Sequence, residues 1–260
     1  MVSRIQKAFE KKNSTPCLIP YITAGLPDRD TCVNLVLSLE ALGARILELG
    51  IPFSDPILDG PVLQRANHSA LSKGINTQFV ISLVQEIREK TERIAIVIMS
   101  YLNPIYAYGP RRFFRDVKKA GADGIIIPDC PLEEITMYRN EARSHGLDII
   151  LMASPLTSPK RLELISSSSS GFLYYTTSKG ITGPRIALPK DLKEKLITVK
   201  SISKLPVAAG FGISHKTHWE MLWEYCDGIV VGSALMQIVM ESKVKEVIQR
   251  LEDFVNELIG

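Results

Sequence analysis

The chain has 260 residues, of which 45% are hydrophobic and 23% are charged, a composition typical of a globular protein with a large core. Its net charge of +3 is small and dispersed, which argues against a nucleic-acid-binding protein. No segment approaches the ~20 consecutive apolar residues of a membrane span, and residues 1–13 do not resemble a secretory signal. The four cysteines include no CxxC pair, so we expect a cytoplasmic protein without a cysteine-bound metal.

Short apolar segments alternate with longer amphipathic ones along the chain. They are almost continuous in Ile, Val and Leu, which is typical of parallel strands buried on both faces. There are eight, at residues 17–22, 45–49, 94–99, 124–127, 148–152, 172–175, 206–209 and 228–231. This alternation predicts an α/β fold, the eight-stranded parallel (β/α)8 or TIM barrel, as one domain over residues 1–260. The alternative is an open doubly wound sheet, but TAGLP rather than GxGxxG follows the first strand.

The amphipathic segments predict the surrounding helices. Apolar residues recur at helical spacing within residues 28–42, 110–120, 133–144 and 244–259. A helix at 189–201 would carry Pro189 in its first turn, where proline is favoured. We expect extra helices at the N-terminus and after the second strand, the latter at residues 77–90. The serine run at 166–170 is expected to be a solvated helix end.

One carboxylate interrupts the second apolar segment. Glu48 stands between two leucines, and burying an unpaired charge is costly, so it must face the barrel mouth and find a partner or have a raised pKa. Polar groups at the C-terminal ends of barrel strands are usually catalytic, which favours a catalytic Glu48 over a structural carboxylate paired with Arg or Lys. Asp55 and Asp59 follow in a proline-stiffened loop, where each could instead form a turn or cap the helix from Pro61.

Glycine-rich loops follow the seventh and eighth strands. Glycine lets backbone N–H groups approach an anion, and helix N-termini add positive dipole ends. TIM barrels commonly bind phosphate at these two loops, and a long loop at 176–188 would contribute a third side. The expected phosphate-binding residues are Thr182, Gly183, Gly210, Phe211, Gly212, Gly232 and Ser233.

Two other strand ends leave alternatives open. Tyr174 could turn its hydroxyl into the pocket or pack in the core, and Asp129 could orient a neighbouring group or cap a helix near Leu132. The predicted strands carry no interior lysine and no histidine at their ends, and no GxSxG motif is present. These absences argue against a Schiff-base aldolase, a zinc site and a serine hydrolase, and His215 and His218 are expected to be a solvated pair. Carboxylate acid–base chemistry on a phosphorylated substrate, without a metal, is the remaining interpretation.

The sequence resembles the tryptophan synthase α subunit family over nearly its whole length. The likeness lies in ELGIPFSDP at 48–56 with DGP at 59–61, and in segments that follow the family's order: PYITAG at 20–25, YLNP at 101–104, GITG at 180–183, GFGIS at 210–214 and VGS at 231–233. The resemblance implies retro-aldol cleavage of indole-3-glycerol phosphate to indole and glyceraldehyde 3-phosphate. It also implies an α2β2 assembly in which a β subunit receives the indole for L-tryptophan synthesis. Pyridoxal phosphate would belong to that subunit, so no cofactor is expected on this chain.

The resemblance further implies roles for single residues. Glu48 would protonate indole C3 and take the proton from the glycerol hydroxyl, while Asp59 would accept the indole N–H and stabilise the cationic indolenine. Tyr174 would complete the catalytic set. The residues expected to wall the pocket are Tyr21, Met99, Tyr101 and Asp129.

Two positions depart from the family's pattern. Leu58 stands where alanine is usual beside Asp59, and Lys179 stands where arginine is common. Because of Leu58, one alternative stays open, in which the chain is a non-catalytic or weakly catalytic subunit that mainly activates a β subunit. A free-standing lyase with the same chemistry and no obligatory partner is the second alternative.

Overall fold

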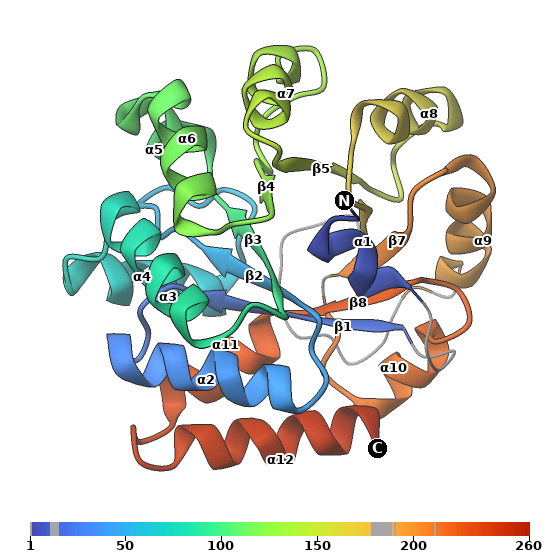
Figure 1. Cartoon of the computed structure of the whole chain (residues 1–260). Coiled ribbons are helices and arrows are strands. Elements are labelled where there is room, and N and C mark those ends of the chain that lie inside the picture. Colours follow the sequence, from blue (N-terminus) through green and yellow to red (C-terminus); the bar gives the residue numbers. More distant parts are fainter. Residues whose placement is uncertain (1, 11–15, 178–188, 190, 211) are drawn as a thin grey trace.

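The computed structural model describes residues 2–10, 16–177, 189, 191–210 and 212–260. Its parallel strands are β1 (Cys17–Thr23), β2 (Ile46–Gly50), β3 (Ala95–Met99), β4 (Gly124–Ile126), β5 (Asp148–Ala153), β6 (Leu173–Thr176), β7 (Val207–Gly210) and β8 (Gly228–Val231). They pair in chain order, and β8 pairs with β1 to close the barrel (Figure 1). This closed (β/α)8 barrel confirms the predicted fold class and excludes the open doubly wound sheet.

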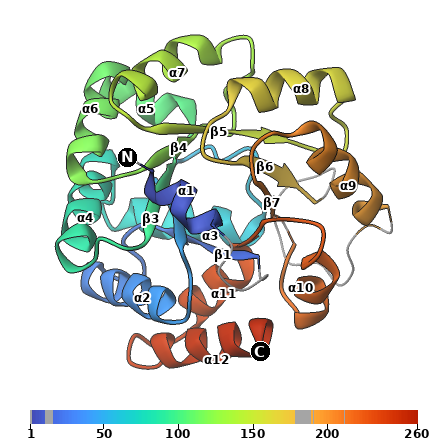
Figure 2. The same cartoon turned by 45° about the vertical axis from the view of Figure 1, so that its right-hand side comes forward.

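Helices surround the barrel on its outside, except for the first, which lies across one end (Figures 1 and 2). They are α1 (Arg4–Phe9), α2 (Arg29–Ala41), α3 (Pro61–Ser72), α4 (Thr77–Lys90), α5 (Leu102–Tyr108), α6 (Pro110–Ala120), α7 (Ile135–Ser144), α8 (Pro159–Ser168), α9 (Leu192–Ile202), α10 (Lys216–Leu222), α11 (Ser233–Glu241) and α12 (Val247–Ile259). The expected extra helices at the N-terminus and after β2 are present as α1 and α4. None of the helices described is both long and apolar enough to span a bilayer.

Three predicted helix starts were too early. Helix α9 begins at Leu192 rather than Pro189, because a turn comes first in which the Leu192 N–H donates to the Pro189 carbonyl at 3.1 Å. A similar turn precedes α12, where the Glu246 N–H donates to the Lys243 carbonyl at 2.9 Å. Helix α7 likewise starts at its Ile135 after a turn. Apolar periodicity continues through such turns, so it does not reveal where helical hydrogen bonding starts.

Helix α1 lies across the end of the barrel where the strands begin. Figure 2 shows it over the middle of the ring of helices. Its Ile5 and Ala8 are buried in the inner core cluster, together with Ile46 at the start of β2 and Phe172 just before β6. The helix therefore closes this end of the barrel, and the cavity that the strand ends can form lies at the other end.

The alternation along β2 decides where its side chains point. Leu47 and Leu49 belong to the outer core between strands and helices, whereas Ile46 belongs to the inner core. Successive side chains of a strand point to opposite faces, so Glu48 shares the inward face with Ile46. Its register partners are Tyr21 on β1 and Val97 on β3. The strand pattern therefore places this carboxylate inside the barrel.

Candidate active site

Glu48 is a buried carboxylate with few compensating contacts. Only 1% of the residue is exposed, and its Oε1 has no hydrogen-bond partner among the described residues. Burial penalises the charged form and raises the pKa of Glu48 from 4.5 to about 8. A group that holds its proton at neutral pH can act as a general acid and, once ionised, as a base.

The Glu48 side chain opens into a cavity at the C-terminal ends of the strands. The lining residues come from β1, β2, β3, β6 and β8, from the start of α3 and from the segments that follow β2, β7 and β8. They are Tyr21, Glu48, Asp59, Leu63, Met99, Tyr174, Gly212, Ile213, Val230, Gly232 and Ser233. This is the end of the fold at which TIM-barrel active sites lie. Eight of the residues expected from the sequence thus face one cavity, together with Leu63, Ile213 and Val230, which were not anticipated.

Asp59 enters this cavity from the loop between β2 and α3. The Asn67 side-chain amide donates to its Oδ2 at 3.1 Å, and the Gln64 amide donates to its carbonyl at 2.8 Å. Burial raises the pKa of Asp59 to about 7, while hydrogen bonds from Asn67 and Tyr101 act in the opposite direction. The alternative role as helix cap does not hold, since Gly60 is the N-cap of α3 and no side chain caps it.

Asp55 lies apart from the cavity. It is exposed and accepts a hydrogen bond from the Ser54 hydroxyl at 2.5 Å, and its carbonyl accepts from the Ile57 N–H at 2.9 Å. These contacts are those of a turn residue. The loop therefore carries two acids in different environments, and only Asp59 is positioned for chemistry.

Tyr101 and Asp129 are not among the residues that line this cavity, which differs from the prediction that both would wall it. The Tyr101 hydroxyl interacts with the Asp59 carboxylate and accepts the Leu58 N–H at 3.2 Å. Asp129 Oδ1 accepts the Leu102 N–H at 2.9 Å and so holds the first residue of α5, next to Tyr101. Of the alternatives for Asp129, the structure supports the orientation of a neighbouring group, because its bond goes to α5 and not to α7.

Tyr21 and Tyr174 lie in the barrel interior, and each stacks on a glycine of the next strand. A Cβ atom at Gly50 would overlap the Tyr21 hydroxyl, and one at Gly210 would overlap the Tyr174 hydroxyl. Burial, followed by the charges of Glu48 and Asp59, raises the pKa of Tyr174 well above its usual value. Tyr174 both lines the cavity and packs in the inner core, so both roles that the sequence left open for this side chain apply.

The glycine loops meet the same cavity. Gly212 has φ of +81°, a conformation that favours glycine, and Gly232 is the N-cap of α11, whose first residue is Ser233. These three residues line the cavity, while Gly210 ends β7 beneath Tyr174. A helix N-terminus beside glycine backbone is suited to an anion. The other expected contributors, Thr182, Gly183 and Phe211, lie outside the described residues, as does Lys179.

Asn67 is the polar residue that sequence reasoning missed. It is 2% exposed, its Nδ2 also donates to the Leu63 carbonyl at 2.8 Å, and its Oδ1 accepts the Phe53 N–H at 3.0 Å. One signal was available, since Asn67 falls on the face of α3 that also buries Leu63 and Ala70. A polar residue on an apolar helix face needs partners, and Asn67 finds them in Asp59 and Phe53 of the loop before α3 and in the Leu63 carbonyl within α3.

The histidine pair is not fully solvated as predicted. His218 is 3% exposed, and its Nδ1 accepts the Ser214 N–H at 3.3 Å, because α10 turns this side chain toward the barrel. Within the described part of the chain, no three His, Cys, Asp or Glu side chains come together in a group that could hold a metal ion.

Fold and site together define a class, that of β/α-barrel enzymes with acid–base carboxylates and an anion-binding cavity at the C-terminal strand ends. The tryptophan synthase alpha chain family matches residues 7–259. This chain is 45% identical to the tryptophan synthase alpha chain of Geobacillus kaustophilus, over 91% of this chain and 86% of that one. It is 40% identical to that of a Roseiflexus species, over the full length of both chains.

Solved structures agree with these relatives. The alpha chain of tryptophan synthase from Legionella pneumophila superposes with a TM-score of 0.89 at 35% identity, over 99% of this chain and 96% of that one. A chain of the α2β2 tryptophan synthase complex from Pyrococcus furiosus superposes with a TM-score of 0.88 at 38% identity, over 96% and 99%. The chain described here belongs to the tryptophan synthase alpha chain family, and is thus an enzymatic subunit of tryptophan biosynthesis, a lyase.

Proposed function

We propose that this chain cleaves indole-3-glycerol phosphate into indole and glyceraldehyde 3-phosphate. The observation that carries the proposal is the pair of buried carboxylates, Glu48 and Asp59, that face one cavity with the glycine loops. Their environments differ, since the Glu48 Oε1 has no partner among the described residues whereas Asp59 accepts a hydrogen bond from Asn67. Two carboxylates in unlike surroundings can take unlike roles, one as acid and one as anion.

Glu48 would move the proton of the reaction. Because its pKa is about 8, the carboxyl carries a proton at neutral pH and can give it to indole C3. The resulting carboxylate then takes the proton of the glycerol hydroxyl. The oxygen's electron pair forms the aldehyde C=O, the bond between C3 and the glycerol carbon breaks, and its electrons return to the indole ring. The net change is one proton shifted from oxygen to carbon, and Glu48 ends as it began.

Asp59 would stabilise the cation formed in between. Protonation at C3 places positive charge on the indole nitrogen, and an adjacent carboxylate accepts the N–H and offsets that charge. Hydrogen bonds from Asn67 and Tyr101 lower the pKa of Asp59 against the effect of burial. They therefore keep a fraction of this carboxyl ionised at neutral pH, and the cation itself would favour the ionised form further.

The glycine loops would hold the phosphate group. The backbone at Gly212 and Gly232 and the start of α11 at Ser233 face the cavity, and we assign the phosphate to them together with Thr182 and Gly183. Binding the phosphate remote from the reacting carbon fixes the position of the indole between the two acids.

We also propose a β-subunit partner in an α2β2 assembly that receives the indole, since a chain of the Pyrococcus furiosus α2β2 complex shares this fold over 99% of its own length and 96% of this chain. Pyridoxal phosphate is assigned to that partner and no cofactor to this chain. A cytoplasmic location is supported by the cysteines, because Cys17, Cys32, Cys130 and Cys226 are all free thiols, as is usual in a reducing compartment.

The decisive experiment measures release of indole from indole-3-glycerol phosphate, with and without added β subunit. We expect slow cleavage by the chain alone, stimulation by the β subunit, and loss of both in Glu48→Gln. Activation of the β subunit without any cleavage would instead support a non-catalytic subunit. Full activity that the β subunit does not stimulate would support a free-standing lyase, and unchanged turnover in Glu48→Gln would refute the role of Glu48.

A further inference from the structure

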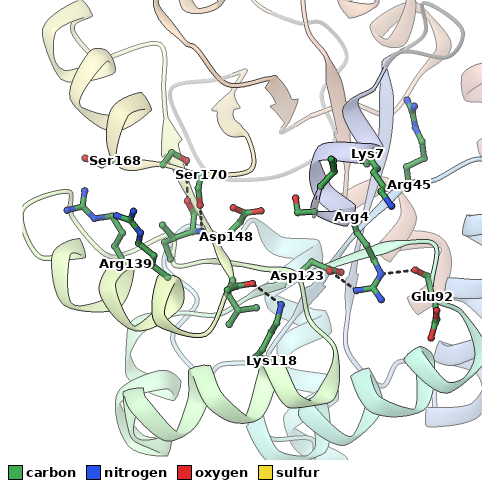
Figure 3. Close-up of a pocket in the computed structure, with 18 of the residues that line it drawn as sticks. Arg4, Lys7, Arg45, Glu92, Lys118, Asp123, Arg139, Asp148, Ser168 and Ser170 are labelled. Atoms are coloured by element: carbon green, nitrogen blue, oxygen red, sulfur yellow. Dashed lines mark hydrogen bonds and ion pairs between the residues drawn. The ribbon is translucent and has the colours of Figure 1, made fainter.

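A second hollow lies at the opposite end of the barrel from the active site (Figure 3). Its walls include α1 and residues at the starts of strands, among them Arg45 before β2, Asp123 before β4, Asp148 at the start of β5 and Ser170 before β6. The cavity with Glu48 lies at the C-terminal strand ends. The two sites share no lining residue, so the second one needs a separate explanation.

The hollow is strongly basic. Seven Lys or Arg side chains and three Asp or Glu side chains line it, an excess of four positive charges, whereas the whole chain carries a net charge of +3. The rest of the molecule therefore has no net positive charge. Concentrating like charge around a concave surface raises the potential there and attracts anions.

Two of the three acidic side chains in the hollow, Asp123 and Asp148, already interact with other groups of the chain. Asp123 Oδ1 pairs with Arg4 at 3.0 Å, its Oδ2 pairs with Arg88 at 3.0 Å, and the Ile96 N–H donates to Oδ2 at 2.9 Å. Asp148 hydrogen-bonds to Ser170, and a Cβ atom at Gly171 would lie 3.2 Å from its carboxyl. Both carboxylates are thus fixed in the wall; Asp123 offsets the charge of Arg4, and neither forms an ion pair with Lys7 or Arg139.

Of the remaining basic side chains, Arg93 pairs with Glu40 at 3.1 Å and Lys118 donates to the Gly146 carbonyl at 2.8 Å, whereas the others stand on two sides of the hollow. Figure 3 shows Arg139 on one side and Lys7 and Arg45 on the other, with Asp148 and Asp123 between them. Among the residues that the structure describes, Lys7, Arg139 and the neighbouring Arg143 form no ion pair. Unpaired cations that face each other across a concave surface are suited to a ligand with negative charge at both ends.

The serine run supplies the wall next to these cations. The run at 166–170 was expected to be a solvated helix end, but α8 ends at Ser168, and Ser169 and Ser170 lie beyond the helix. The Ser169 hydroxyl accepts the Leu151 N–H at 3.0 Å, and the Ser170 hydroxyl accepts the Ile149 N–H at 2.9 Å. These bonds satisfy backbone groups at the start of β5 and make the wall of the hollow polar and rigid.

We propose that this hollow binds a multivalent small-molecule anion of the oligophosphate class. Arginine and lysine bind phosphate oxygens through charge-assisted hydrogen bonds, and arginine does so with two donors at once. Cations on two sides favour an elongated anion over a single phosphate. The site is independent of the proposed catalytic function, because it lies at the other end of the barrel.

The test is a calorimetric titration of the full chain with tripolyphosphate, beside a titration with orthophosphate. The variant Lys7→Gln/Arg139→Gln removes one cation from each side of the hollow. Its matched control, Lys160→Gln/Lys245→Gln, removes two exposed cations that do not line it. We expect tripolyphosphate to bind the natural chain more tightly than orthophosphate does, about tenfold or more weaker binding in the first variant, and no change in the control.

Three outcomes would overturn the proposal. One is the absence of tripolyphosphate binding to the natural chain, and the second is equal weakening in both variants, which would mean general charge attraction. The third is displacement of tripolyphosphate by saturating glycerol 3-phosphate, which would place the anion at the glycine loops. Thermal unfolding of both variants and their indole-releasing activity should match the natural chain, which separates loss of this site from loss of the fold or of the catalytic function.

Discussion

The side-chain amide of Asn67 joins both ends of the loop that carries Asp59. Its Nδ2 donates to Asp59 Oδ2 at 3.1 Å, and its Oδ1 accepts the Phe53 N–H at 3.0 Å. One helix residue therefore fixes the loop where it leaves β2 and where it presents its carboxylate. Without this amide, the Asp59 carboxyl would lose a donor and the Phe53 N–H would lose its acceptor.

We expect Asn67→Leu to lower kcat/KM by roughly ten- to a hundredfold, since both the position and the charge of Asp59 depend on the amide. Unpaired groups left in the buried loop should also lower the free energy of unfolding by about 1–3 kcal/mol. Steady-state cleavage assays and denaturant unfolding measure the two effects. Asn140→Leu, an exposed change on α7, is the control and should leave both values near those of the natural chain. Equal activities in the two variants would contradict the role of Asn67.

The pH dependence of kcat/KM should be bell-shaped with a narrow optimum. The proposed mechanism needs an ionised Asp59, whose pKa is about 7, and a protonated Glu48, whose pKa is about 8. Activity should therefore fall on the acid side as Asp59 gains its proton and on the alkaline side as Glu48 loses its own. In Asn67→Leu the loss of a hydrogen bond that lowers the Asp59 pKa should move the acid limb to higher pH. A profile that stays flat from acid to alkaline conditions would contradict both assignments.

Glu48 should make the chain less stable as pH rises. Its pKa is about 8 in the folded chain and 4.5 as the ordinary value, so the unfolded chain releases the proton first. The free energy of unfolding therefore falls as the pH increases from 4.5 towards 8, by roughly 1.4 kcal/mol per pH unit. Glu48→Gln cannot ionise, so it should exceed the natural chain in free energy of unfolding by a few kcal/mol at alkaline pH, with the difference shrinking in acid. Denaturant unfolding across this range measures it, and the exposed change Glu257→Gln serves as control. A constant difference at all pH values would show that Glu48 is not the titrating group.

Gly50 should be intolerant of even one methyl group. A Cβ atom there would overlap the Tyr21 hydroxyl in the barrel interior, where the side chain has little room to move, so Gly50→Ala should cost about 1–3 kcal/mol of stability and reduce activity. The cause can be isolated in a double-mutant cycle, because Tyr21→Leu removes the group that the methyl meets. The two changes together should be less harmful than their sum, whereas simple additivity would show that the overlap is not responsible.

The sequence by itself determined the barrel. Eight apolar segments separated by amphipathic ones admit few other arrangements, because strands buried on both faces must be covered by the helices between them. It also singled out Glu48, since a carboxylate between two leucines is costly unless it faces a functional cavity. The glycine loops after β7 and β8 could be predicted for a related reason, because the fold itself brings those two strand ends together.

Only the tertiary structure decided which side chains support these groups. Asn67 comes from α3 and Tyr101 from the start of α5, and local sequence does not show that both reach Asp59. Asp129 likewise serves α5, which precedes it in the chain, rather than the helix that follows it. The basic hollow is assembled from α1, the residue before β2, α7 and the serine run, segments whose residues lie as far apart as Lys7 and Arg139. Such contacts depend on which distant segments pack against each other, and the spacing of residues along the chain does not reveal this packing.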